Sequence, residues 1–172
     1  MKVRSGIFKR SLATLILTAL PFAMYGAQDI HSVTTNVRLH NDGSATITQK
    51  WAATVSDITE WYIPIGNLGK MEVTDLRVSE NGRQFESDGR RWITDRPKSR
   101  KEGRCGIVEK INGVELCWGS GDDGYHEWTC TYELSGLVKS YNDRDGFNHK
   151  FVNAGLGNIG TVSLEIEADG QQ

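Results

Sequence analysis

The sequence predicts an all-β protein, an antiparallel β-sandwich of about seven to nine strands with immunoglobulin-like packing of its two sheets. From Val33 onward, apolar and polar residues alternate with a period of two, which is typical of half-buried strands. Turn-forming pairs such as Asn81-Gly82 separate the alternating segments, and no window carries a sustained helical stripe. A barrel fits the same alternation and stays open as the alternative.

The first 27 residues are of a different kind. An apolar run, Leu12–Met24, leads to a small-residue exit at Gly26-Ala27, and it follows a basic start formed by Lys2, Arg4, Lys9 and Arg10. This order is typical of a secretory signal peptide, and the run is too short for a hydrocarbon core of about 30 Å. We therefore predict a signal peptide over 1–27, a single β-sandwich domain over 28–172, and export to the periplasm or cell surface. An uncleaved membrane anchor is the alternative.

The first predicted element of the domain is a hairpin over residues 33–55. Asn41-Asp42-Gly43-Ser44 supplies its turn, because glycine adopts a positive φ without strain. Val33 and Val37 share one face before this turn, and Ile47 and Trp51 share one face after it. The two faces together predict a half-buried pair of strands.

The next two predicted strands carry local irregularities. Pro64 interrupts the apolar run Trp61–Ile65 and favours an edge strand or an extended crossover, because proline cannot donate to a ladder. In the segment 71–78 the apolar parity changes between Val73 and Leu76. A bulge near Thr74-Asp75 accounts for that change, since one extra residue moves every later side chain to the other face.

The second half of the domain continues the alternating pattern. Ile111-Asn112-Gly113 predicts a hairpin turn, and Tyr125–Leu134 alternates cleanly as one strand after the glycine-rich loop 119–124. The segment 137–151 fits either a strand or one helical turn. In the last strand we expect three side chains to face inward: Val162, Leu164 and Ile166.

The charge balance excludes one class of function. Four of the 20 Lys and Arg residues and none of the 22 acidic residues lie in the first 27 residues, so the exported part has a net charge of about −6. Nucleic-acid binding requires the opposite balance. One stretch, 90–104, is rich in Lys and Arg. It is interpreted either as a contact for anionic envelope polymers or lipid head groups, or as a solvated loop.

The three cysteines allow one disulfide within the chain. Cys105 and Cys117 flank the turn at Ile111-Asn112-Gly113, and Cys130 lies on the apolar parity of its strand, as expected of a buried thiol. A two-residue Asn-Gly turn would leave Cys105 and Cys117 three positions out of register, too far for a bridge. A longer loop centred on Ile111 would place them opposite each other. The disulfide between Cys105 and Cys117 therefore stays open.

Each candidate for chemistry fails a specific requirement. His126-Glu127 lacks a second histidine four residues on, and Asp143-Arg144-Asp145-Gly146 lacks the flanking ligands of a calcium loop. We predict no catalytic residue, no metal site and no cofactor. Of the five tryptophans, Trp51 and Trp128 are expected in the core, whereas Trp61, Trp92 and Trp118 form either core packing or a platform for stacking sugars.

The order of these features resembles the extracytoplasmic N-terminal domain of the YciQ-like predicted membrane proteins, a family of unknown function. The likeness spans residues 29–168, and the matching segments are Asn41–Thr48 leading to Trp51, Trp61–Ile65, Glu115–Gly119, Tyr125–Tyr132, and Val138–Asp143 before Phe147 and Phe151. The resemblance implies a cell-envelope component with a membrane tether in later transmembrane helices, which this sequence does not include. A truncated copy, a fragment and a freely soluble version all stay open.

Together these observations predict a non-enzymatic β-domain of the cell envelope that serves interaction or structure. Its expected partner is an envelope protein or polymer, not a nucleic acid. A carbohydrate-binding module that uses exposed tryptophans is the alternative. A hydrolase whose histidine and aspartate come together only in space is a further, weaker one.

Overall fold

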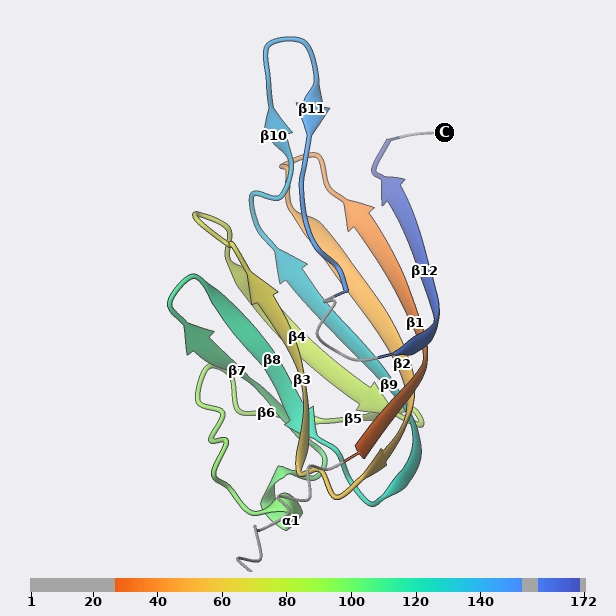
Figure 1. The fold of residues 1–172 in the computed structure, drawn as a ribbon. Helices are drawn as coiled ribbons and strands as arrows, with labels where there is room; N and C mark the ends of the chain where they lie inside the picture. The colour runs from red at the N-terminus through yellow and green to blue at the C-terminus, as the bar shows by residue number, and fades with distance from the viewer. Residues whose placement is uncertain (1–26, 153–157, 171–172) are drawn as a thin grey trace, which may run out of the picture.

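The protein is built almost entirely of strands in a computed structural model that describes residues 27–152 and 158–170. These strands form a six-stranded sheet, a four-stranded sheet and a small two-stranded hairpin (Figure 1). The predicted signal peptide lies outside the described residues, except for Ala27, which begins the first strand. The all-β prediction is confirmed, with two separate multi-strand sheets rather than one closed sheet.

The larger sheet, which we call sheet A, has six strands. In spatial order they are β12 (Ile159–Ala168), β1 (Ala27–Leu39), β2 (Ala45–Ser56), β9 (Gly124–Leu134), β4 (Val73–Glu80) and β5 (Arg83–Gln84). The predicted first hairpin is confirmed as β1 and β2, whose register places Val33 opposite Trp51. β12 runs parallel to β1, so the expectation of purely antiparallel pairing is wrong here. The alternation fixes which face a side chain takes, but it is the same for either strand direction.

The smaller sheet, which we call sheet B, has four strands. In spatial order they are β3 (Glu60–Gly66), β8 (Gly113–Gly119), β7 (Arg104–Lys110) and β6 (Glu86–Ser87). β3 contains Pro64 and lies at the edge of the sheet, as predicted. A single helical turn, α1 (Lys98–Lys101), precedes β7. The segment 137–151 forms a projecting hairpin of β10 (Lys139–Ser140) and β11 (Asp145–Gly146), visible at the top of Figure 1.

The predicted bulge in β4 is confirmed. The register between β4 and β9 shifts between Thr74 and Arg77, and Asp75 has a φ of +52°. The extra residue brings both Val73 and Leu76 to the buried face. Apolar side chains before and after the bulge therefore contribute to the same core.

One hydrophobic core lies between the two sheets. Four buried tryptophans meet at its centre, two from sheet A (Trp51 and Trp128) and two from sheet B (Trp61 and Trp118). The ring centroids of Trp61 and Trp128 are 5.0 Å apart, and those of Trp51 and Trp61 are 5.6 Å apart. These contacts across the sheets bury the largest side chains of the domain and hold the two layers face to face.

Candidate functional site

The tryptophans do not form a sugar-binding platform. Trp61, Trp92 and Trp118 are 2%, 7% and 0% exposed, so the alternative of exposed indole rings is wrong. Core packing is confirmed for Trp61 and Trp118, whereas Trp92 is buried outside the core cluster. Trp92 covers the outer face of sheet B, where a Cβ at Gly106 would lie 3.1 Å from the Trp92 Cβ. Its indole N–H donates to Glu60 over 2.7 Å.

Most of the basic stretch 90–104 is neutralised inside the domain. Asp88 accepts from Arg96 and Arg104, and these hydrogen bonds, that of Arg104 first, hold the pKa of the Asp88 carboxyl below its usual range. Further cations of the stretch pair as Arg90–Glu109, Lys98–Asp123 and Lys101–Glu60. Because most of these cations already pair with carboxylates of the domain, little positive charge is left to bind an anionic polymer. The stretch is therefore neither an open binding patch nor a loop whose charges face only water.

The cysteines are free thiols, all buried. The β7–β8 turn has Ile111-Asn112 at its centre, because Lys110 pairs with Gly113. This register places Cys117 opposite Gly106 and Cys105 opposite Trp118, so the two cysteines point to opposite faces of sheet B. The alternative in which Cys105 and Cys117 form a disulfide is therefore wrong. Burial raises the pKa of Cys105 to about 11 and that of Cys117 to about 12, which leaves both thiols protonated and unreactive.

One histidine lies in an arrangement that resembles a catalytic triad. His40 Nδ1 is 2.8 Å from Asp169 Oδ2, and His40 Nε2 is 2.8 Å from Thr46 Oγ1. The Thr46 hydroxyl, however, donates its hydrogen to Glu133 over 2.7 Å. The one hydroxyl hydrogen of Thr46 is therefore directed to Glu133 and not to His40, so the arrangement lacks the hydroxyl-to-histidine hydrogen bond of a catalytic triad. Sequence reasoning missed this cluster because Asp169 lies 129 positions from His40.

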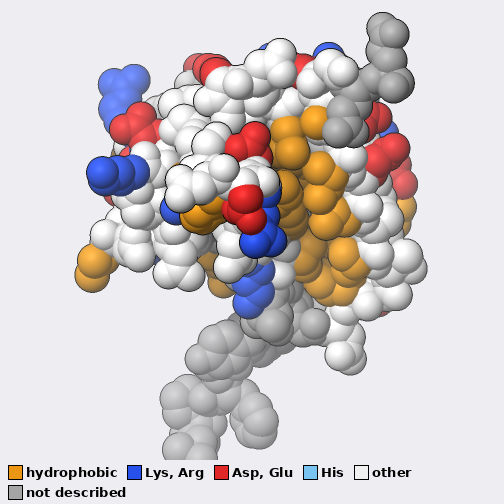
Figure 2. Space-filling model, turned by 90° about the horizontal axis from the view of Figure 1, so that it is seen from above, with side chains coloured by type: hydrophobic (Ala, Val, Ile, Leu, Met, Phe, Trp, Pro, Cys, Tyr) orange, Lys and Arg blue, Asp and Glu red, His pale blue; other side chains and the backbone are white. Residues whose placement is uncertain are grey.

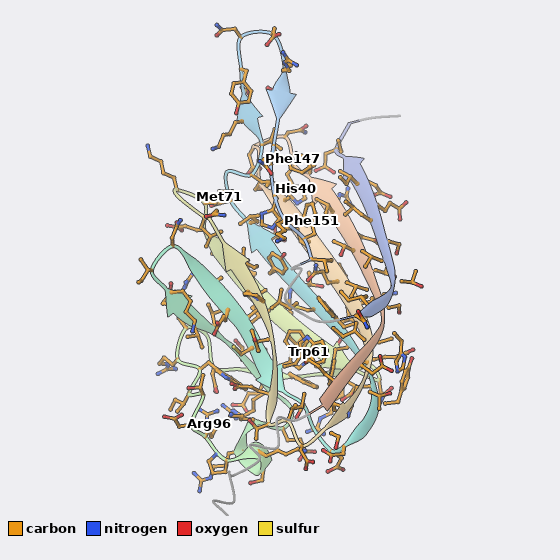
Figure 3. The ribbon with its side chains drawn as sticks, viewed as in Figure 1. His40, Trp61, Met71, Arg96, Phe147 and Phe151 are labelled. Carbon is orange, nitrogen blue, oxygen red and sulfur yellow. The ribbon has the colours of Figure 1, made fainter. Side chains whose placement is uncertain are left out.

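We call this cluster the β12 anchor, because it fixes the end of the last strand to the rest of sheet A. Asp169 also accepts from Arg38 Nε over 2.8 Å, and its backbone N–H donates to Leu39 over 2.9 Å. The hydrogen bonds from His40 and Arg38, in that order, lower the pKa of Asp169. A cleft of about 390 Å³ lies beside the anchor on the outer face of sheet A. Figure 3 shows His40 near the upper end of the molecule.

The opposite end of β12 is fixed by a glycine. A Cβ at Gly160 would lie 2.5 Å from the backbone oxygen of His31, closer than any real side chain approaches. The register of β1 against β2 shifts at this point, between Ile30 and Ser32. Glycine therefore allows the last strand to pass the irregularity in β1 and pair along its length.

The inner face of β12 is the most unusual surface of the domain. Val162, Leu164 and Ile166 are 52%, 50% and 45% exposed, although their β1 neighbours Val33 and Val37 are fully buried. They lie on the expected face, but the expectation that they are buried is wrong. Sheet A has six strands and sheet B only four, and β12 is the outermost strand of sheet A. Seen from above, hydrophobic side chains form a continuous band (Figure 2).

β12 is also the longest edge strand of the two large sheets. The other edge strands of the two large sheets are β5 and β6, of two residues each, and β3, which contains Pro64. Short strands and proline are the usual protections against pairing with another chain. β12 has ten residues and no proline. We call this strand, with its apolar inner face and an outer side that pairs with no other strand of residues 27–152 and 158–170, the open edge.

Over 27–152 and 158–170, no group of three or more His, Cys, Asp or Glu side chains is placed to hold a metal ion. In that same part of the chain, no helix has both the length and the apolar character to cross a membrane.

Comparisons with known proteins do not indicate a function for this chain. No family model and no curated protein matches the sequence. Among solved structures, a proposed protease from Parabacteroides distasonis has a TM-score of 0.32 and 13% identity, over 62% of this chain and 23% of that one. An M1 zinc metallopeptidase from Deinococcus radiodurans has a TM-score of 0.30 and 12% identity, over 66% and 22%. The chain thus spans less than a quarter of either protein, and likenesses this weak carry no argument.

Proposed function

We propose that this chain is a non-enzymatic β-domain of the cell envelope that binds a protein partner along its open edge. The open edge is the observation that carries the proposal, because a long unprotected edge strand with an apolar face is a template for another strand. Three apolar side chains stay about half exposed there, and exposed apolar patches in folded domains mark interaction sites.

Export and family are part of the same proposal. The basic and apolar pattern of residues 1–27 supports export, and the matching segments between residues 29 and 168 support a relationship to the YciQ-like envelope proteins. An immunoglobulin-like sandwich is the finer description of the fold that we propose. The shared tryptophan core between sheets A and B supports it.

The two alternative functions have weaker support. A carbohydrate-binding module needs indole rings that a sugar can reach, and Trp61, Trp92 and Trp118 are buried. A hydrolase of the triad type needs a hydroxyl that donates to its histidine, and the Thr46 hydroxyl beside His40 donates to Glu133 instead. Neither observation favours chemistry or sugar recognition over partner binding.

Photo-crosslinking in the expressing cell tests the proposal. A photoreactive side chain would replace Leu164 in the open edge, and in a separate variant Ile111, an equally apolar and fully exposed residue at the tip of the β7–β8 turn. We expect a discrete adduct on denaturing gels from position 164 and none from position 111. Absence of any adduct at 164, with normal expression and folding, would refute the interaction role.

A further inference from the structure

We infer that the partner of the open edge is a second copy of this chain, joined through antiparallel pairing of β12 with β12 about a two-fold axis. This inference rests on the proposed function and adds the identity of the occupant. The pairing would join the two copies of sheet A into one continuous sheet, since strands add to an edge by backbone hydrogen bonds.

The sequence of β12 is complementary to itself in one register. With Leu164 on the two-fold axis, Leu164 faces Leu164 of the partner subunit and Val162 faces Ile166 of the partner subunit. All three exposed apolar side chains then meet apolar side chains on the same face. Shifting the register by one residue would set the apolar face of one copy beside the polar face of the other.

The charges on the outer face agree with the same register. Around Leu164, Glu165 lies opposite Ser163 of the partner subunit and Glu167 lies opposite Thr161 of the partner subunit. No carboxylate therefore faces a carboxylate. A two-fold axis moved to Glu165 would place two glutamates directly opposite each other, and one moved to Ile166 would pair Glu165 with Glu167; both arrangements are repulsive.

The shape of the domain leaves room for this approach. β12 lies on the side of sheet A away from the strands of sheet B (Figure 1). Because both copies would keep their sheet B on the same side of the joined sheet, the two inner apolar stripes would run next to each other. The β12 anchor and the close approach of Gly160 to His31 hold both ends of the strand against β1 before a partner arrives, so little order has to be gained on pairing.

Cysteine crosslinking tests the register directly. We expect L164C to form an inter-copy disulfide under mild oxidation by copper–phenanthroline, because directly opposed Cβ atoms lie about 4.5–5.5 Å apart. V162C and I166C alone should not crosslink efficiently, whereas an equimolar mixture of the two should. The native thiols are buried and do not compete. Crosslinking of V162C alone to the same extent as L164C would overturn the register.

Sedimentation velocity over a concentration series tests the association itself. We expect a reversible dimer that L164K weakens at least about tenfold, because it sets two ammonium groups against each other. T161K should strengthen association, because each new ammonium lies opposite Glu167 of the partner subunit. A monomer at all concentrations, or an L164K variant that associates like the wild type, would overturn the inference. An adduct at position 164 with a mass other than two chains would leave the proposed interaction role intact and refute only the second copy.

Discussion

The buried Lys101 offers a sharp test of the energetics. Its side chain is 2% exposed, and its ammonium donates to Thr94 O over 2.5 Å and to Thr59 Oγ1 over 3.0 Å. Its carboxylate partner, Glu60, lies 3.1 Å away and also accepts from Trp92. We predict that Lys101→Met destabilises the domain, because it removes the cation and leaves the carboxylate without its compensating charge.

The magnitude follows from the burial of the pair. Removing one partner of a buried ion pair costs about 3–5 kcal/mol. The side chain of Glu60 is 20% exposed, so water can solvate part of the abandoned carboxylate, and we expect a value near the lower bound of about 3 kcal/mol. For a domain of this size that corresponds to a fall in Tm of about 6–12 °C. The matched control is Lys98→Met on the same helical turn, because Lys98 and Asp123 are 36% and 47% exposed and such a pair is worth less than about 1 kcal/mol.

Urea unfolding of five proteins measures this effect: the wild type, K101M, E60Q, the double variant of these two changes and the control K98M. We expect the double variant to be more stable than the sum of the two single changes by about 1–2 kcal/mol, because it removes both charges together. A K101M cost no larger than that of K98M would refute the reasoning. So would additivity of the two changes within about 0.5 kcal/mol.

Three further predictions concern other parts of the domain. Gly160→Ala should speed backbone hydrogen exchange in β12 at least about tenfold and leave the core strands unchanged, because its Cβ would meet His31 O at 2.5 Å; equal protection in β12 would contradict the close approach. Arg104 lowers the pKa of Asp88, so this carboxylate stabilises the fold above its unfolded pKa of about 3.9, and the contribution is lost as the pH falls through the lower folded value. Urea midpoints between pH 5 and pH 2 should therefore decline more steeply for the wild type than for D88N. Cys117, with a pKa of about 12, should react with a thiol reagent at pH 8 only as fast as the domain opens, and labelling at the rate of a free thiol would refute its burial.

Local patterns in the sequence predicted the strands and their faces well. Alternation identified β2 and β9, and the parity change between Val73 and Leu76 located the bulge at Asp75. These features depend on neighbours within a few residues, where side-chain periodicity is a direct consequence of backbone geometry. The sequence left the β7–β8 register open between an Asn112-Gly113 turn and a longer loop centred on Ile111. The observed turn, Ile111-Asn112, lies between these two, and its register sends Cys105 and Cys117 to opposite faces.

The candidate site depended on relations that local patterns do not contain. The exposure of Val162, Leu164 and Ile166 follows from the number of strands in each sheet and from which strand lies outermost. The β12 anchor joins His40 to Asp169 across most of the chain. The one signal in the sequence was the strand itself, ten residues without proline. That it is the long edge of the domain became apparent only by comparison with the other edge strands, which are short or contain proline.

The parallel pairing of β1 with β12 also has a mechanical consequence. Because the two strands run in the same direction, β1 begins at the lower end of the domain and β12 finishes at the upper end (Figure 1). A force that pulls these two points apart acts along the strands and shears the ladder between them. The hydrogen bonds from Ile30 to Leu39 would then share the load and break together, whereas a peeling force breaks them one after another. The domain is thus built to resist stretching between its first and last strands.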